Sequence, residues 1–229
     1  MTIGIIGAMD EEIALLQKQI KNQTIETVAN TIYIKGTLET KDVVLVKSGI
    51  GKVNAAMTTA ILMERYQPTF VINTGSAGGF SKALKVGDVV ISDAVVHHDV
   101  DVTAFDYVHG QVPQMPATFK ANETLVRQVR MILNEMEIDS EIGLIATGDS
   151  FMNDQTKVQT VRELFPNMIA CEMEAAAIAQ VCYQYNVPFV VIRALSDIAG
   201  QEAPMSFQQF LEVAATNAAK LIMEFVKRV

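Results

Sequence analysis

The sequence is poor in cysteine, in basic charge and in long apolar runs, and each shortage argues against a class of protein. Its 229 residues include 18 Lys and Arg against 26 Asp and Glu, a formal net charge of -8. Binding to nucleic acid or to an anionic membrane surface needs a basic surface, so neither partner is expected. A neutral or zwitterionic small molecule suits this composition better.

The scarcity of cysteine argues against a disulfide-stabilised scaffold. Cys171 and Cys182 are predicted to lie at the two ends of one helix, about 16 Å apart at the usual helical rise. That distance is too long for a disulfide, so we expect two reduced packing residues, as in most cytosolic proteins.

The start of the chain has neither a basic leader nor a long apolar run. The apolar residues 3–9 are followed at once by Asp10, Glu11 and Glu12. A signal peptide or a membrane span is therefore not predicted, and we expect a cytoplasmic protein.

Apolar strands alternate with amphipathic helices along the chain. Strands are predicted at residues 3–7, 43–48, 70–74, 89–92, 142–147 and 189–196. Helices are predicted at residues 11–20, 53–66, 123–136, 157–165, 173–185 and 206–226. Several strands are too continuously apolar for a sheet with one buried face. We therefore predict one α/β domain over residues 1–229, a three-layer α/β/α sandwich around a central mixed, mainly parallel sheet.

Glycines follow several of the predicted strands, among them Gly7, Gly51 and Gly75. In open parallel sheets the ligand crevice lies at the carboxyl ends of the strands. A tight turn is the commoner reason for any single glycine, so the indication comes from their joint placement. Residues 74–79 have the spacing of neither a dinucleotide loop nor a P-loop, and no lysine follows them. We predict no cofactor.

Residues 97–119 are predicted to form a long irregular segment. Segments of this kind more often have a function than not.

Eight motifs carry a family resemblance: GIIGAMDEE, KSGIGKVNAA, NTGSAGG, GDVVISD, DVTAF, GDSF, EMEAAAIA and RALSDIA. Together they extend over nearly the whole chain and resemble the motif series of bacterial 5'-methylthioadenosine/S-adenosylhomocysteine nucleosidases. SGIGKV belongs to the wider nucleoside phosphorylase superfamily, whereas the acidic first loop combined with EMEAAAIA and SDIA is specific to the nucleosidases. Asp10 departs from the pattern, because the family usually has Glu there.

The resemblance implies a nucleoside phosphorylase-like fold and a hydrolase. It would cleave the N-glycosidic bond of 5'-methylthioadenosine and S-adenosylhomocysteine to adenine and a thioribose product, in methionine salvage and the activated methyl cycle. 5'-Deoxyadenosine would be a further substrate.

Two acidic residues are assigned catalytic roles by this resemblance. Asp197 directly follows a strand, where an acid is also an ordinary helix cap or turn residue. The family makes it the general acid that protonates the leaving adenine, oriented by Ser196, and burial would raise its pKa for that purpose. Glu12 lies in the first turn of a helix, where any acid is favourable to the helix dipole. By resemblance it activates the attacking water, which Ser76 and Arg193 help to hold.

The substrate-binding residues also come from the resemblance. Glu174 would bind the ribose hydroxyls with Met173 packed on the sugar, while Phe151 and the backbone of Met152 would bind adenine. Further residues would line the crevice (Gly78) or surround the 5'-alkylthio group (Met9, Ile50 and Phe207), where composition alone indicates core residues. Val102, Phe105 and Pro113 would close the pocket from the other subunit of a homodimer.

A run of ligand-type residues, His97, His98, Asp99, Asp101 and His109, suggests a metal site at first sight. Adjacent residues on an extended segment point in opposite directions, and no recognised ligand spacing occurs. We therefore predict no metal.

Two other functions stay open. A nucleoside phosphorylase of the same fold would use phosphate in place of water and needs a cationic first loop, whereas Asp10, Glu11 and Glu12 would repel a phosphate dianion. A non-catalytic nucleoside-binding protein would keep the scaffold without the chemistry. The presence of both Glu12 and Asp197 argues against that alternative.

Overall fold

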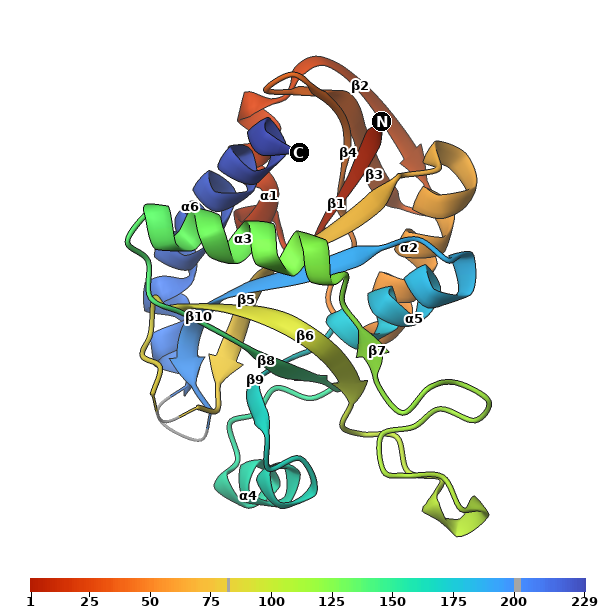
Figure 1. The fold of residues 1–229 in the computed structure, drawn as a ribbon, viewed down its shortest axis with the longest axis vertical. Helices are drawn as coiled ribbons and strands as arrows, with labels where there is room; N and C mark the ends of the chain where they lie inside the picture. The colour runs from red at the N-terminus through yellow and green to blue at the C-terminus, as the bar shows by residue number, and fades with distance from the viewer. Residues whose placement is uncertain (82, 200–202) are drawn as a thin grey trace.

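The computed structural model describes residues 1–81, 83–199 and 203–229, without the side chains of residues 203–209, 212 and 213. In this part of the chain a 10-stranded sheet has the order β10-β6-β8-β9-β5-β1-β4-β3-β2, with β7 paired to β6 (Figure 1). The strands are β1 (Thr2–Gly7), β2 (Lys21–Val28), β3 (Thr31–Leu38), β4 (Lys41–Lys47), β5 (Phe70–Gly79), β6 (Val89–His97), β7 (Phe119–Lys120), β8 (Ser140–Thr147), β9 (Met168–Glu172) and β10 (Phe189–Ile198). The helices are α1 (Asp10–Gln19), α2 (Lys52–Tyr66), α3 (Glu123–Glu135), α4 (Gln155–Leu164), α5 (Ala175–Tyr185), α6 (Ala203–Arg228) and the short 3-10 helix η1 (Thr103–Phe105).

The sheet is mixed and partly closed. Parallel pairing joins β1 to β4 and β5, β10 to β5, and β8 to β6 and β9. The remaining pairs are antiparallel, and most of them involve strands that the sequence did not predict. Because β10 pairs with both β6 and β5, the strands β10, β6, β8, β9 and β5 form a closed ring. The predicted α/β class with a mixed sheet is confirmed.

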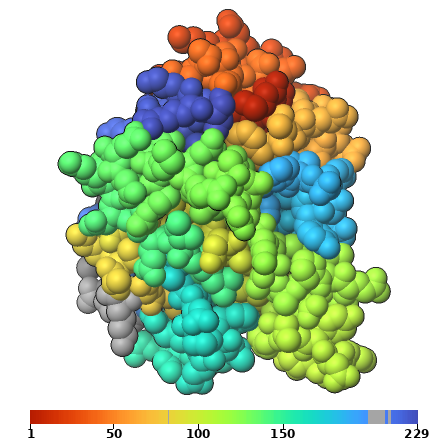
Figure 2. Space-filling model, in the orientation of Figure 1, coloured from red at the N-terminus to blue at the C-terminus, as the bar shows by residue number. Residues whose placement is uncertain are grey.

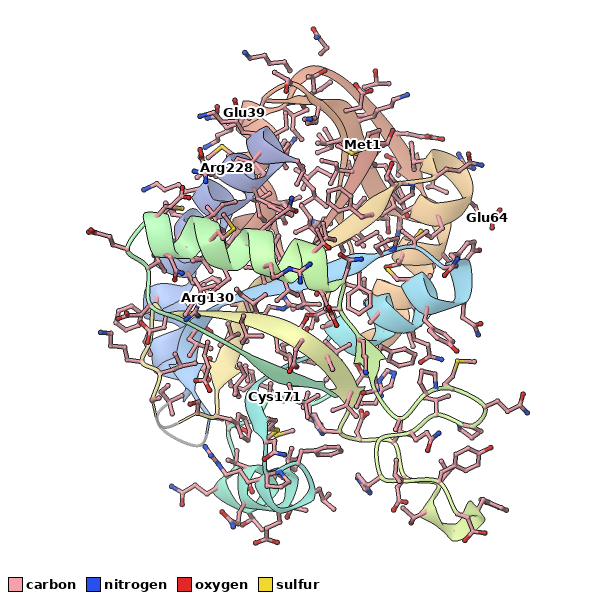
Figure 3. The ribbon with its side chains drawn as sticks, viewed as in Figure 1. Met1, Glu39, Glu64, Arg130, Cys171 and Arg228 are labelled. Carbon is pink, nitrogen blue, oxygen red and sulfur yellow. The ribbon has the colours of Figure 1, made fainter. Side chains whose placement is uncertain are left out.

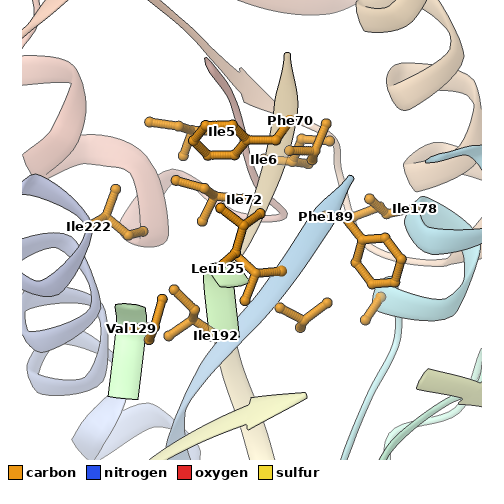
Figure 4. Packing of buried hydrophobic residues seen from close by; sticks show 14 of the residues in the cluster. Ile5, Ile6, Phe70, Ile72, Leu125, Val129, Ile178, Phe189, Ile192 and Ile222 are labelled. Atoms are coloured by element: carbon orange, nitrogen blue, oxygen red, sulfur yellow. The ribbon is translucent and has the colours of Figure 1, made fainter. Parts of the chain in front are cut away.

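Helices cover the sheet from two sides (Figure 1). The helix α6 contacts α1, α3 and the strands on one side, while α2 packs on α5 on the other side. The apolar core fills the space between these layers. In Figure 4, Ile5, Ile72 and Ile192 from three neighbouring strands lie between Ile222 of α6 and Ile178 of α5. This arrangement explains why the strands read as continuously apolar: both of their faces are covered.

The strands β5 and β10 are longer than the sequence predicts, and this extension builds the site. Gly75, Gly78 and Gly79 were predicted to follow the strand, but they belong to β5 and pair with β10. The register of this pair shifts between Leu195 and Asp197, so the residue between them forms a β-bulge. A bulge bends the strand and redirects side chains, which makes it a common device beside functional sites.

The sequence prediction missed the strands β2, β3, β7 and β9 and misplaced one cysteine. The strand β2 was missed because it is exposed along almost its whole length, so it has no apolar face to signal a strand. Cys171 was placed at the end of a helix but lies in β9 (Figure 3). Cys182 lies in α5. Both thiols are buried and free, as predicted, and burial raises the pKa of each above its ordinary value.

The segment between β6 and β7 is irregular, as predicted, and has only η1 as regular structure. It forms a separate lobe at the lower right of Figure 2. Among the described residues no helix is both long enough and apolar enough to cross a membrane.

Candidate active site

A cavity of about 440 Å³ lies where β1, β5, β9 and β10 end. Its lining comes from widely separated parts of the chain: Ala8, Met9, Glu12, Ile50, Ser76, Ala77, Gly78, Phe151, Cys171, Glu172, Met173, Glu174, Ser196 and Asp197. Four of these residues are buried acids, and acids almost never lie inside a protein unless they are partnered. A larger cavity of about 720 Å³ lies beside the start of α3, but the one acid among its lining residues, Glu123, is exposed. The smaller cavity is therefore the candidate active site.

Glu12 is held at the start of α1 by donors on both of its carboxylate oxygens. Oε2 accepts hydrogen bonds from the backbone N–H groups of Ala8 at 2.7 Å and Met9 at 3.1 Å. Oε1 accepts from the backbone N–H of Ser76 at 2.9 Å and from its hydroxyl at 3.1 Å. The bond to Met9 is the N-terminal capping contact of α1, so Glu12 caps its helix and faces the cavity at once. Four donors fix the carboxylate in one orientation.

Arg193 lies fully buried in β10, behind the cavity, and binds two of the acids. Its guanidinium donates to Glu172 Oε2, donates to Asn73 Oδ1 at 2.8 Å, and lies 3.5 Å from Glu174 Oε2. Although burial alone would lower the pKa of Arg193, the three nearby carboxylates of Glu172, Glu174 and Glu12 raise it. The guanidinium therefore stays charged and compensates the acids around it.

Glu174 is the acid that this network leaves only partly neutralised. Its Oε1 accepts a hydrogen bond from the backbone N–H of Gly51 at 2.9 Å. Burial is the main cause that raises the pKa of Glu174, and the charge of Glu172 raises it further, while Arg193 and the bond from Gly51 act in the opposite direction. Glu172, in contrast, also accepts from the hydroxyl of Thr147 and from two backbone N–H groups. Glu174 thus retains capacity to bind polar groups of a ligand.

Counting only partners among the described residues, Asp197 has the fewest of the four cavity acids. The β-bulge at Ser196 leaves both Ser196 and Asp197 lining the cavity, and the Ser196 hydroxyl donates to Asp197 Oδ1 at 2.8 Å. Burial raises the pKa of Asp197, and this hydroxyl only partly offsets the increase. A Cβ atom on Gly78 would lie 3.2 Å from Asp197 Oδ2, so the glycine gives the carboxyl its space. This carboxyl is suited to carry a proton.

The sequence model of the Phosphorylase superfamily matches residues 2–227. A 5'-methylthioadenosine/S-adenosylhomocysteine nucleosidase of Oceanobacillus iheyensis is 61% identical over 229 residues, which are 100% of both chains. The chain belongs to this nucleosidase family. The predicted resemblance is thereby confirmed, and the identity extends beyond the short motifs to the full length.

Solved structures of nucleosidases have the same fold as this chain. The Neisseria meningitidis enzyme, in complex with methylthio-immucillin-A, has a TM-score of 0.97 and 48% identity, covering 100% of this chain and 99% of that one. The Colwellia psychrerythraea enzyme, in complex with adenine, has a TM-score of 0.96 and 48% identity, with 99% and 94% of the two chains covered. These values establish the nucleosidase fold for this protein.

Most of the residues predicted for the nucleosidase site lie around the one cavity. The lining includes Met9, Glu12, Ile50, Ser76, Gly78, Phe151, Met173, Glu174, Ser196 and Asp197. Arg193 lies one layer behind them, and Met152 is buried in an apolar cluster next to the cavity. The side chain of Phe207 lies outside the described residues. Val102, Phe105 and Pro113 do not line the cavity of their own chain.

The prediction omitted several residues that line or support the candidate active site. Ala8, Ala77, Cys171 and Glu172 also line the cavity, and Asn73 holds the guanidinium of Arg193. Glu172 could have been predicted from the sequence, because Glu172 and Glu174 both precede a buried helix, and buried acids require partners. The small apolar residues carried none, since nothing distinguishes them from core residues.

Of the candidate metal ligands of the sequence, His97 and Asp99 contact other side chains, whereas Nε2 of His98 is buried with no hydrogen-bond partner among the described residues. His97 Nε2 lies 3.0 Å from Gln180 Oε1, and Asp99 binds Lys52. Within residues 1–81, 83–199 and 203–229 no three His, Cys, Asp or Glu side chains are grouped as metal ligands. Burial lowers the pKa of both His97 and His98.

Proposed function

We propose that this protein hydrolyses the N-glycosidic bond of 5'-methylthioadenosine and S-adenosylhomocysteine, with Asp197 as the general acid and Glu12 as the base. The observation that carries the proposal is the contrast between two buried carboxyls in one cavity. From the residues that the structure describes, Glu12 accepts four hydrogen bonds, whereas Asp197 accepts one and has a raised pKa. When two carboxyl groups lie in different environments, their pKa values differ, and one can act as the acid while the other acts as the base.

Asp197 would protonate the imidazole ring of adenine as the glycosidic bond breaks. Adenine is a poor leaving group as an anion, so a proton delivered in the transition state lowers the barrier. The raised pKa of Asp197 supports this role because the protonated form persists to higher pH than for an exposed Asp. Ser196 donates to Oδ1, which leaves Oδ2 as the oxygen that carries the proton.

Glu12 would accept a proton from the attacking water. The Ser76 hydroxyl lies 3.1 Å from Glu12 Oε1 and forms one wall of the cavity, so a water beside it would meet both groups. The division of labour resembles inverting glycoside hydrolysis, in which water attacks an oxocarbenium-like sugar opposite the leaving group. Arg193 would act indirectly, by neutralising the acids that surround the sugar.

The remaining contacts are proposed from the resemblance to the nucleosidases, and most of the residues concerned line the cavity. Glu174 would accept hydrogen bonds from the ribose hydroxyls, and Met173 would pack against the sugar. Phe151 would stack on adenine, while the backbone of Met152 would bind the edge of the base. Met9, Ile50 and Phe207 would surround the 5'-alkylthio group. The adenine and methylthio-immucillin-A bound by the related enzymes support a site for a purine and a short alkylthio chain. The same contacts would accept 5'-deoxyadenosine.

Phosphate would fit this site poorly, which favours water as the nucleophile. Among the described lining residues there is no Lys or Arg, and the nearby Arg193 is already bound by Glu172. A phosphate dianion would face Glu12, Glu172 and Glu174 without an uncommitted cation. Incubating the protein with 5'-methylthioadenosine in phosphate-free buffer tests this point. Release of adenine and methylthioribose is expected, and a strict need for phosphate would identify a phosphorylase instead.

We also infer a cytoplasmic homodimer formed by one domain per chain, with a small molecule as the ligand and neither nucleic acid nor membrane as partner. Ile50 and Phe151 line the cavity yet are 50% and 41% exposed, so the cavity has an uncovered apolar rim. Phe105, on the lobe after β6, is 75% exposed. Val102, Phe105 and Pro113 of one subunit would cover the rim of the other. The acidic composition and free thiols support the cytoplasmic location.

A further inference from the structure

We propose that Lys52, Asp99 and Asp149 form a clamp that holds the adenine-binding loop against the ribose-binding segment. Each of the three residues is hydrogen-bonded to the other two. The backbone N–H of Lys52 donates to Asp149 Oδ1 at 2.8 Å, and its ammonium donates to Asp99 Oδ1 at 2.5 Å. The backbone N–H of Asp149 donates to Asp99 Oδ2 at 3.0 Å, which completes the triangle. None of the three lines the cavity, so the clamp consists of positioning residues.

Each of the three residues lies in or next to a segment that reaches the site. Lys52 follows Gly51, whose N–H binds Glu174 Oε1 at 2.9 Å. Asp149 precedes Phe151 by two positions, and Asp99 opens the irregular segment after β6. The clamp therefore sets the distance between the loop that carries Phe151 and the backbone that holds Glu174. The proposal rests on the assignment of Phe151 to adenine and of Glu174 to ribose.

Close packing at two glycines supports a fixed arrangement of these segments. A Cβ atom on Gly148 would collide with the imidazole of His98, so the start of the loop lies directly against the residue before Asp99. A Cβ atom on Gly51 would lie 3.1 Å from Asp149 Oδ1, and the φ of +96° at Gly51 is itself costly for other residues. Glycine at these two positions therefore lets the backbone lie close to His98 and to Asp149.

The charges of the clamp suit a partly buried position. The Lys52 side chain is 20% exposed and that of Asp99 31%, so water screens this pair less than an ordinary surface pair. Although burial alone would raise the pKa of Asp99, the hydrogen bonds from Lys52 and from the Asp149 N–H lower it. Asp99 is thus ionised at neutral pH and holds both neighbours. Isolated surface ion pairs add little to stability, so the main effect of this pair is expected on geometry.

Binding of adenine, which contains only the base, isolates the proposed role from the chemistry. Asp99→Ala and Lys52→Met are each expected to weaken adenine binding about tenfold and to raise KM for 5'-methylthioadenosine, with kcat changing less, because a displaced loop affects binding of the base first. The double variant should bind adenine no worse than either single variant, since both remove one shared network. Lys52→Arg should restore most of the affinity. Glu135→Gln, which breaks the exposed pair with Arg228, serves as the matched control and should change none of these values.

Hydrogen exchange of residues 148–154 separates the possible outcomes. In the unmodified protein adenine should slow exchange of this segment, and in Asp99→Ala exchange without ligand should be faster. Unchanged exchange and unchanged adenine affinity in Asp99→Ala, with protection by adenine intact in the unmodified protein, would overturn the clamp alone. Absence of adenine protection in the unmodified protein would overturn the assignment of Phe151 and the clamp together.

Discussion

Ser196 Oγ donates a hydrogen bond of 2.8 Å to Oδ1 of its neighbour Asp197, and both residues line the same cavity. In a regular strand neighbouring side chains point to opposite faces, so this contact depends on the β-bulge in β10. The bulge brings the acid and the hydroxyl that orients it into one site.

Asp197 should make the stability of the protein depend on pH. Its pKa is raised above the unfolded value, so its contribution to stability is present below that value, about 4, and is lost as pH rises through the raised folded pKa. Asp197→Asn should therefore have a higher Tm than the unmodified protein at pH 8, and the difference should shrink toward pH 4. Thermal melts across this range measure it, with Asp106→Asn at an exposed position as control. A constant or reversed difference would contradict the raised pKa.

Glu12→Gln should separate binding from turnover. The amide keeps the size of the side chain and one acceptor oxygen, so the ribose and adenine contacts should remain, but it cannot accept the proton of water. Turnover should fall by at least the ~100-fold typical of losing a general base. Calorimetric titration with methylthio-immucillin-A should still detect binding. Loss of binding would make Glu12 a structural or binding residue, because its capping contact to α1 would then be its main role.

Gly75 is expected to tolerate no side chain. A Cβ atom there would collide with the Arg193 guanidinium and lie 2.7 Å from Glu12 Oε1. Gly75→Ala should lower the free energy of unfolding by about 1–3 kcal/mol, as overpacking of a core does, and should reduce turnover. Gly87→Ala is the control, because Gly87 also has a positive φ but, chain neighbours aside, no atom of the described residues lies within 4 Å of a Cβ there. Equal losses of stability in the two variants would show that glycine is required at position 75 for its backbone conformation, and not because of the contact with Arg193 and Glu12.

Phe105 should serve the site of the other subunit. Phe105→Ala should weaken binding of 5'-methylthioadenosine more than binding of adenine, at about 0.8 kcal/mol per buried methylene-sized group. When Phe105→Ala chains are mixed with Asp197→Asn chains, each mixed dimer should contain one site with both defects and one with neither. Activity should then reappear. No recovery, with mixed dimers confirmed by mass spectrometry, would place Phe105 in its own chain's site or outside any site.

The core strands were predictable from sequence because their burial is uniform. In β1 and β10 nearly every residue is buried, and a continuous apolar run carries that information. The exposed strand β2 has no such run, and β9 has only five residues. The extension of β5 through Gly75 to Gly79 was hidden because glycines usually end a strand, whereas here they make room for side chains of the site.

The site was predictable only in part. The resemblance to the nucleosidase motifs indicated Glu12, Glu174 and Asp197, and all three line the cavity. The pairing of Arg193 with Glu172 depends on the distance between two strands far apart in sequence, and the bulge at Ser196 depends on the register of β10 against β5. Periodicity describes one strand at a time and contains no information on register.

The assignment of Asp197 as the general acid is the central claim, and the turnover of Asp197→Asn tests it most directly. The substitution keeps the shape of the side chain and an acceptor for the Ser196 hydroxyl, but it removes the transferable proton. Release of adenine from 5'-methylthioadenosine should be at least ~100-fold slower than in the unmodified protein, while methylthio-immucillin-A still binds in a calorimetric titration. Near-normal turnover of the purified, folded variant would contradict the mechanism.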